Sequence, residues 1–376
     1  MRRRILWCVA AAAGALVVLL VASPLLGQAM AFTPPGTCKT CHPAKFRDWS
    51  KSLHAESCTS PLVNFVYQQG LDEAADMVKG MCPRCHAPAA FRNETTDTSS
   101  TDFLAGVQCS VCHLIDAVNP PCGNGSYVLC NDSLMRGCLL YPRAPHGTKF
   151  SGLHESSMLC ATCHNLKNNT NAQIAATGME WTSSPAGAQS VPCQRCHMPV
   201  GTGVAAKGAA RRDDIHSHGF LGSTSADMRK RALKLALTAQ REGNAVKAHV
   251  QATNAGAGHA VPSGMGPRSV VLTVALVDGQ GKALDQKEFR YQRLPVDDNG
   301  QPSTIWSATK MQCNTIMAGA TVEHDVALAV PADAGQGLRV TARVMYHWQP
   351  PELSQNEKLK GKVRGPALMT EAAAGL

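Results

Sequence analysis

The chain contains few aromatic residues for its length. Phe, Trp and Tyr make up 5% of its 376 residues, which is low for a conventional hydrophobic core in a protein of this size. After the first residues it also lacks any apolar run long enough to span a bilayer. These shortages exclude a protein with several membrane spans and argue against a core built mainly of aromatic side chains.

The N-terminus has the pattern of an export signal. Arg2, Arg3 and Arg4 precede the apolar run 5–22, and small residues at 29–31 suit a cleavage site, so residues 1–31 are expected to be removed and Phe32 to begin the mature chain. The predicted location is periplasmic or extracellular. The alternative is an uncleaved membrane anchor, because an 18-residue run is near the lower limit for a span.

Five copies of one pentad, Cys-x-x-Cys-His, dominate the rest of the N-terminal half. Two thiols at this spacing can add to both vinyl groups of one haem, and the adjoining His then becomes the proximal iron ligand. The pentads begin at Cys38, Cys82, Cys109, Cys160 and Cys193; their second cysteines are Cys41, Cys85, Cys112, Cys163 and Cys196, and their histidines are His42, His86, His113, His164 and His197.

Two other chemistries use a Cys-x-x-Cys pair. A structural zinc site seldom places His directly after the second Cys, and a thioredoxin-like dithiol does not recur five times in one chain. The pattern therefore predicts five covalently attached c-type haems. Their intervals of 44, 27, 51 and 33 residues are too uneven for a regular solenoid repeat and suit short helices and loops wrapped around a haem stack.

Attached haems would change both the expected core and the net charge of the protein. Five porphyrins supply large apolar surfaces, so the cofactors are expected to form most of the N-terminal core. Loss of the leader lowers the formal charge from +9 to about +6, and ten ionised propionates bring it to about −4. The basic residues are thus no argument for nucleic acid as a partner.

Five cysteines lie outside the leader and the pentads. They are Cys58, Cys122, Cys130, Cys138 and Cys313. Three of them crowd residues 122–138, so one disulfide is expected there in an oxidising compartment. Because the number is odd, at least one thiol stays unpaired or pairs elsewhere, and the spacing does not say which.

Composition and periodicity predict an α+β protein of two domains. Residues 32–222 read as a mostly helix-and-loop multihaem cytochrome domain, with helices at 44–56 and 71–79. A connecting helix is expected within 223–243, capped by Ser225 and running to about Arg241. Period-two patterns predict an antiparallel β-sandwich at 244–350, with strands near 246–252, 270–277, 284–291, 322–330 and 338–346, and residues 351–376 are taken as a tail.

Five irons need second axial ligands, and the histidines outside the pentads are the candidates. His54 lies 12 residues beyond His42, too far along a helix to return to the same haem, so it would reach a neighbouring one; an exposed helix histidine is the alternative. His146 and His154 flank a loop that enters the fourth pentad.

Three more candidates follow the last pentad. His216 and His218 are two residues apart and point to opposite faces of an extended chain, so at most one should serve a given haem. We favour His218. His259 lies in a glycine-rich loop that could present it to a haem edge, whereas strand histidines such as His249, His324 and His347 are expected to be surface or core residues.

Several phrases beyond the pentads resemble a known group. "DWSKSLHA", "GVQCSVCH", "LCATCHN" and "CQRCHMP" are similar to the multihaem cytochrome superfamily that contains the tetrahaem electron acceptor of hydroxylamine oxidoreductase, with pentahaem nitrite reductase as a more distant relative. "GHAVPSG" and the strands after it resemble a C-terminal β-domain of that group. The resemblance implies mostly bis-histidine irons, with His54, His146 and one of His216 or His218 as distal ligands.

The chain departs from the catalytic members of that group. It has no Cys-x-x-Cys-Lys pentad, which carries the catalytic haem of the nitrite reductase, and only five tyrosines and five pentads against the longer octahaem chain of hydroxylamine oxidoreductase, which cross-links a haem to tyrosine. Both departures argue against catalysis of either kind.

Three functions remain open at this point. The leading interpretation is an electron carrier in respiratory or extracellular electron transfer, exchanging electrons with other cytochromes or a membrane quinol-oxidising complex. The alternatives are an oxidoreductase with one open iron that acts on a nitrogen or sulfur compound, and a subunit of a cytochrome conduit or filament, hence an oligomer, docked through its β-domain.

Overall fold

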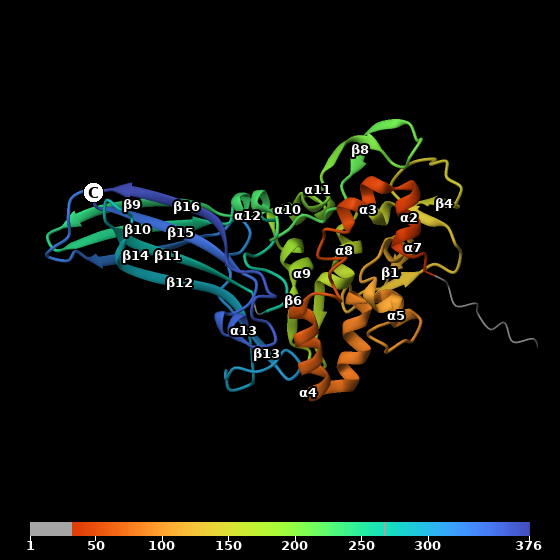
Figure 1. The fold of residues 1–376 in the computed structure, drawn as a ribbon, viewed down its shortest axis with the longest axis horizontal. Helices are drawn as coiled ribbons and strands as arrows, with labels where there is room; N and C mark the ends of the chain where they lie inside the picture. The colour runs from red at the N-terminus through yellow and green to blue at the C-terminus, as the bar shows by residue number, and fades with distance from the viewer. Residues whose placement is uncertain (1–31, 267) are drawn as a thin grey trace, which may run out of the picture. The chain divides into compact units, whose positions relative to one another are not determined.

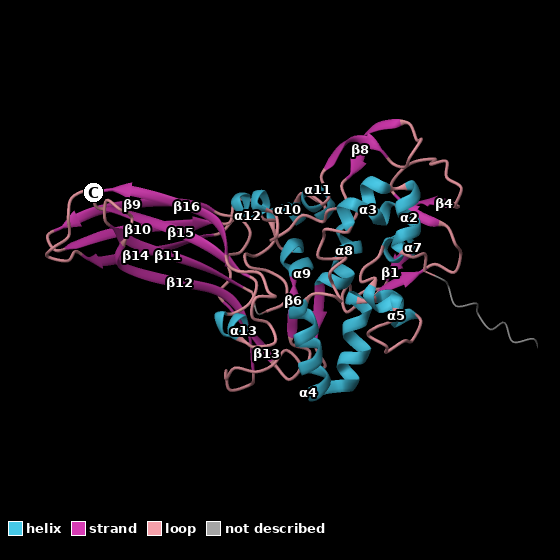
Figure 2. Ribbon diagram, in the orientation of Figure 1, coloured by secondary structure: helices cyan, strands magenta, loops and turns pink. Residues whose placement is uncertain are grey.

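The computed structural model describes residues 32–266 and 268–376, and residues 33–376 form one compact unit. The expected signal peptide, residues 1–31, lies outside the described residues. Within them, no helix has both the length and the apolar character needed to cross a membrane. Helices and short strands occupy the N-terminal part and long strands the C-terminal part, as Figures 1 and 2 show.

The N-terminal part consists of short helices joined by loops and small strand pairs. Its helices are α2 Pro35–Cys41, α3 Pro43–Trp49, α4 Pro61–His86, α5 Pro88–Arg92, α6 Thr101–Leu104, α7 Cys109–Leu114, the 3₁₀ helix η1 Gly152–Glu155, α8 Ser157–His164, α9 Thr177–Thr182, α10 Pro185–Ala188 and α11 Cys193–His197. Several begin with proline, whose missing N–H and fixed φ suit the first helical turn.

Four strand pairs connect these helices. They are β1 Ile115–Val118 with β2 Tyr127–Leu129, β3 Met135–Gly137 with β4 Thr148–Phe150, β5 Asn165–Lys167 with β6 Gln173–Ala176, and β7 Val200–Val204 with β8 Arg211–His216. The β3–β4 pair is parallel and the others are antiparallel.

Two antiparallel sheets form the C-terminal part and confirm the expected α+β class. One has the order β14 Thr321–Ala329, β10 Ala245–Thr253, β9 Lys234–Glu242. The other has the order β13 Lys310–Cys313, β12 Ala283–Val296, β11 Ser269–Val277, β15 Arg339–His347, β16 Ala367–Gly375. Inward residues of both sheets, such as Val250 on β10 and Leu272 on β11, share one core. The predicted strands 246–252, 270–277, 284–291, 322–330 and 338–346 are confirmed.

The expected helix at 44–56 is wrong after its first half. Helix α3 ends at Trp49, and turns follow it to Thr59. Ser50 donates its hydroxyl to Arg47 O at 3.1 Å, and Ser52 accepts the N–H of Ala55 at 3.4 Å. Serine side chains compete in this way with the helical backbone pattern, so His54 lies in a turn. The helix expected at 71–79 is part of the longer α4, which does not stop at Gly80 and is kinked at Ala74.

Two expectations at the edges of the β-sandwich are also wrong. Ser225 caps a helix, but α12 is only Ala226–Ala232, and the chain continues as β9. Leu233, Leu235 and Leu237 recur every second residue, which is the period of a strand, and pack on the sandwich core. The expected tail holds the helix α13 Pro351–Gln355 and strand β16, which pairs with β15 and buries Met369.

A buried ion pair joins α9 to the β-sandwich. Arg293 on β12 donates to Glu180 Oε1 at 3.0 Å, and the two side chains are only 9% and 7% exposed. Arg293 also donates to Gln173 O at 2.9 Å, while the other Glu180 oxygen accepts the hydroxyl of Ser263 at 2.5 Å. Each charge is thereby paired and hydrogen bonded, as burial requires.

Replacing Arg293 by Met should lower the free energy of unfolding by about 3–5 kcal/mol, because the Glu180 carboxylate would stay buried without its cation. Denaturant unfolding measures the loss. Arg343→Met is the matched control, since the Arg343–Glu371 pair at 3.3 Å is exposed and should contribute less than about 1 kcal/mol. Equal losses in the two variants would contradict a special role for the buried pair.

Candidate haem-binding site

Each pentad lies at the C-terminal end of a helix, which ends within one residue of the pentad histidine. The pentads occupy α2, the last turn of α4, α7, α8 and α11, and His42 directly follows α2. Residues three and four apart lie on one face of a helix. Each helix therefore presents both thiols and the imidazole of its pentad to the same side, which is the arrangement needed for double thioether attachment and axial ligation.

Backbone carbonyls hold four of the five pentad imidazoles through Nδ1. His42 pairs with Ala205 O at 2.8 Å, His86 with Ser57 O at 3.2 Å and His113 with Arg136 O at 2.5 Å. His197 Nδ1 bonds Leu221 O. Engaging Nδ1 in this way leaves Nε2 as the metal-binding atom and fixes the ring orientation.

Four pentad histidines face a second histidine ring from elsewhere in the chain. The ring centroids are 6.1 Å apart for His42 and His146, 6.3 Å for His164 and His54, 6.2 Å for His113 and His218, and 6.3 Å for His197 and His259. Two imidazoles bound to one ion through bonds of about 2 Å have centroids about 6 Å apart. The residues present thus fit haems held between paired histidines.

His86 is the exception among the pentad histidines. Within residues 32–266 and 268–376, no ring–ring contact is formed between His86 and another histidine. Burial lowers the pKa of His86, and the nearby positive charge of Arg268 lowers it further. Arg268 lines the same cavity and donates to Ser263 O at 3.3 Å. Neither Arg268 nor the Ser57 carbonyl stood out in the sequence, because neither belongs to a motif.

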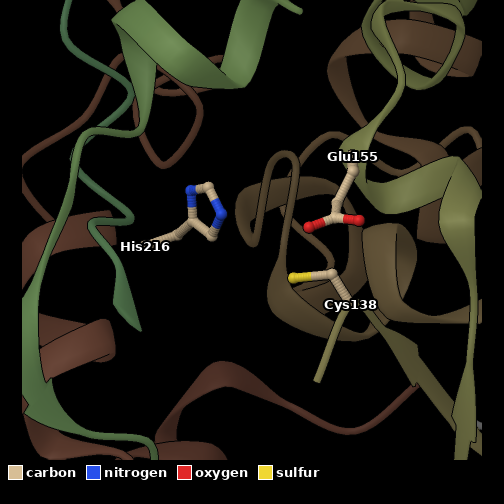
Figure 3. A group of neighbouring side chains, drawn as sticks. All are labelled: Cys138, Glu155 and His216. Atoms are coloured by element: carbon tan, nitrogen blue, oxygen red, sulfur yellow. The ribbon is translucent and has the colours of Figure 1, made fainter. Parts of the chain in front are cut away.

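Two other candidates occupy different positions. The ring of His154 stacks on that of His113 with centroids 5.7 Å apart, but its Nε2 bonds the carbonyl of Cys112 at 2.9 Å. His216 bonds Met198 O through Nδ1 at 2.8 Å and faces Cys138 and Glu155 rather than a pentad histidine (Figure 3). Neither is placed like the four facing partners.

One continuous cavity connects the five pentads. Its volume is about 2130 Å³, and its walls include the cysteines and histidine of every pentad. Pockets for a single small ligand are usually about 300–1,000 Å³, so this space suits several large groups. Burial in it lowers the pKa of His54 to about 4 and those of His164 and His218 to about 3. Low pKa values keep these imidazoles neutral, the form that ligates metals.

Cysteines of different pentads lie close together, and this defines which pentads are neighbours. The thiols of Cys38 and Cys109, of Cys85 and Cys163, and of Cys160 and Cys193 lie close enough to shift each other's pKa values. Burial and the neighbouring Cys163 raise the pKa of Cys112 to about 12. The first pentad therefore adjoins the third, and the fourth adjoins the second, third and fifth.

The five cysteines outside the pentads form no disulfide in the described chain, so the bridge expected within 122–138 is wrong. Their side chains point to different partners: Cys122 bonds Met158 O at 3.4 Å and Cys130 bonds Asp132 O at 3.1 Å, while Cys138 faces Glu155 and His216. These three cysteines are close together in the sequence, but their side chains contact different parts of the structure.

The chain has the fold of the multihaem c-type cytochromes. The family "Cytochrome c554 and c-prime" matches residues 37–114. The crystal structure of a penta-heme cytochrome c552 from Thermochromatium tepidum superposes with a TM-score of 0.76 at 22% sequence identity, over 92% of this chain and 99% of that one. A comparison with curated proteins gives no match.

Replacing His218 by Ala should convert one haem from low to high spin and open it to carbon monoxide, because His113 would lose the ring that faces it. The same outcome is expected for His146→Ala and His259→Ala. Electron paramagnetic resonance of the oxidised protein and carbon monoxide titration of the reduced protein measure the change. His249→Ala is the control, since His249 bonds Asp325 on the sandwich surface; an unchanged His218→Ala spectrum would contradict the pairing.

Proposed function

We propose that the chain is an exported pentahaem c-type cytochrome that carries electrons between other redox proteins. The observation that carries the proposal is the set of four facing histidine pairs at 6.1–6.3 Å, each containing one pentad histidine. A bound haem supplies a one-electron couple at its iron. Histidines on both faces close the iron to substrates, which suits a carrier.

The haem bound at Cys82, Cys85 and His86 is proposed to differ from the other four. Because His86 has a carbonyl partner behind it but no imidazole in front of it, the site keeps one axial position without a histidine. The chain has nine histidines outside the pentads, enough in number to close all five irons. His154 stacks on His113, which His218 also faces, and His216 faces Cys138 and Glu155, so neither histidine adds a partner for His86. We propose one open iron and four closed ones.

The contacts between pentads support a branched path for electrons. The first pentad adjoins the third, the third adjoins the fourth, and the fourth also adjoins the second and fifth. Helix contacts agree, since α2 packs on α7 and α8 on α11. The fourth haem would therefore be the junction of the path, and the second haem would be a side branch.

The proposal also covers the location of the protein and its redox partners. The leader at 1–31 and the covalent haem chemistry support a periplasmic or extracellular location, with an uncleaved anchor as the membrane-bound alternative. Electron donors and acceptors are proposed to be other cytochromes or a membrane quinol-oxidising complex.

An oxidoreductase acting at the second haem is the alternative that one observation favours. Arg268 extends from the loop before β11 into the cavity near His86. A guanidinium beside an open iron suits a small nitrogen or sulfur oxyanion, because it offers paired N–H donors and a fixed positive charge.

Intact mass spectrometry should find five haems attached to the purified protein, with the polypeptide beginning at Phe32. Cys82→Ala together with Cys85→Ala should remove one haem, because the double thioether link needs both sulfurs. Cys313→Ser, an exposed cysteine outside the pentads, serves as the control and should keep all five. Four haems in the unaltered protein would overturn the stoichiometry.

The reduced protein should bind one carbon monoxide per chain, and the oxidised protein should show one high-spin and four low-spin haems. The reason is that His86, alone among the five pentad histidines, faces no other histidine ring in the part of the chain that the structure describes. No carbon monoxide binding would show that another group closes the second haem. Steady turnover of nitrite or hydroxylamine that is lost in Arg268→Gln would favour the oxidoreductase over the carrier.

A further inference from the structure

A cluster of three potential metal ligands lies at the wall of the haem cavity, which Cys138 and His216 line, and belongs to none of the four histidine pairs. Cys138 follows strand β3, Glu155 ends helix η1, and His216 ends strand β8 (Figure 3). Their ligand atoms, one thiol sulfur, one carboxylate oxygen and one ring nitrogen, all lie within 4.8 Å of one another. Segments separated by 17 and 61 residues in sequence thus converge on one point.

The histidine of this cluster is already oriented as a ligand. Its Nδ1 bonds the backbone carbonyl of Met198 at 2.8 Å, which leaves Nε2 free with its lone pair available. A carbonyl behind the ring is the usual support of a metal-binding histidine, because it fixes the tautomer and the ring plane.

The other two members lack competing partners. Cys138 is a free thiol and is only partly exposed. Glu155 takes part in no ion pair among the described residues, and the adjacent Arg212 is committed to Asp214 at 2.5 Å. The Glu155 carboxylate and the Cys138 thiol face each other, and the nearby guanidinium of Arg212 is already paired with Asp214.

The donor set selects the metal. One thiolate, one imidazole and one carboxylate form a mixed soft and borderline set that favours zinc over magnesium or calcium, which prefer oxygen alone. Ligands bound to tetrahedral zinc at about 2.0–2.3 Å lie about 3.5 Å apart. The three ligand atoms lie within 4.8 Å of one another, so small rotations of all three side chains would be needed to reach that separation, with water as the fourth ligand.

Two other roles for the cluster are disfavoured by the geometry. His216 makes no ring–ring contact with a pentad histidine among the described residues, whereas each of the four facing partners does so at 6.1–6.3 Å. Cys138 forms no disulfide. The three side chains are therefore available to one another.

We propose that Cys138, Glu155 and His216 bind one zinc ion, which links the segment after β3 to η1 and β8. This link has a structural consequence for the haem region. His146 follows Cys138 by eight residues and His218 follows His216 by two, so the ion anchors both segments that carry histidines facing the first and third pentads. The proposal does not depend on the electron-transfer function.

Elemental analysis of the purified holoprotein after incubation with zinc and dialysis tests the site. We expect one zinc per chain, and a loss of zinc affinity of more than about 100-fold in Cys138→Ser and His216→Gln, because each removes a direct ligand. Glu155→Gln is a third variant at an exposed position. Cys313→Ser is the matched control and should retain zinc, because Cys313 is exposed on β13 and outside the cluster.

Two further measurements keep the test decisive. The haem content of each variant shows that it has folded, and zinc absorption spectroscopy of the wild type should show one sulfur at about 2.3 Å with the remaining ligands at about 2.0 Å. Less than one tight zinc per chain in the wild type overturns the proposal. So does zinc that stays bound in the three cluster variants, or a zinc coordination shell without sulfur.

Discussion

The N-terminal part depends on one constraint, the pairing of imidazole rings. The two rings of a pair are separated by the distance expected for two ligands of one iron. Each pair joins segments distant in sequence, such as His42 with His146 and His197 with His259. A haem bound between two such rings would hold both segments, one through thioether bonds and axial ligation and the other through ligation alone. Such metal bonds would allow the loops between the helices to be irregular, because the loops would not need a strand ladder to fix their positions.

The distribution of hydrophobic cores agrees with this view. The β-sandwich has one large core, with Leu272, Val274 and Leu328 fully buried. Within the described residues, the N-terminal part has small clusters such as the one around Cys58 and Phe103. Hydrophobic burial is the main stabilising contribution in folding, so the porphyrin faces must provide what the side chains do not. The low content of aromatic residues in the sequence agrees with this difference between the two parts.

Local chemistry made part of the structure predictable. The pentads specify their own helical turns, and the alternation of Val246, Ala248, Val250 and Ala252 specified a strand that the structure contains. His54 was expected to reach a neighbouring haem, and it faces His164, although the helix on which that argument rested ends at Trp49. The helix error has the same origin as the missed strand β9: serine turns and sheet pairing override local helix propensity.

Proximity between distant segments could not be predicted in this way. Nothing near Cys138 in the sequence indicates that its neighbours are Glu155 and His216 instead of Cys122 or Cys130. The same holds for the pairing of His259 with His197, because the loop of His259 is held partly from a distant segment, where Glu180 accepts the Ala260 N–H at 3.3 Å and the Ser263 hydroxyl. These contacts depend on the packing of complete domains, which no window of sequence contains.

The position of His259 also implies an order in which the protein folds and completes its axial ligands. The last pentad is synthesised before the β-sandwich, yet the ring that faces His197 comes from a loop of that later domain. The sandwich in turn is incomplete until strand β16, near the end of the chain, pairs with β15. A haem attached early to Cys193 and Cys196 would therefore keep a single axial histidine until the β-sandwich has folded. The oxidation state and reactivity of that iron would then show whether strand β16 has paired with β15.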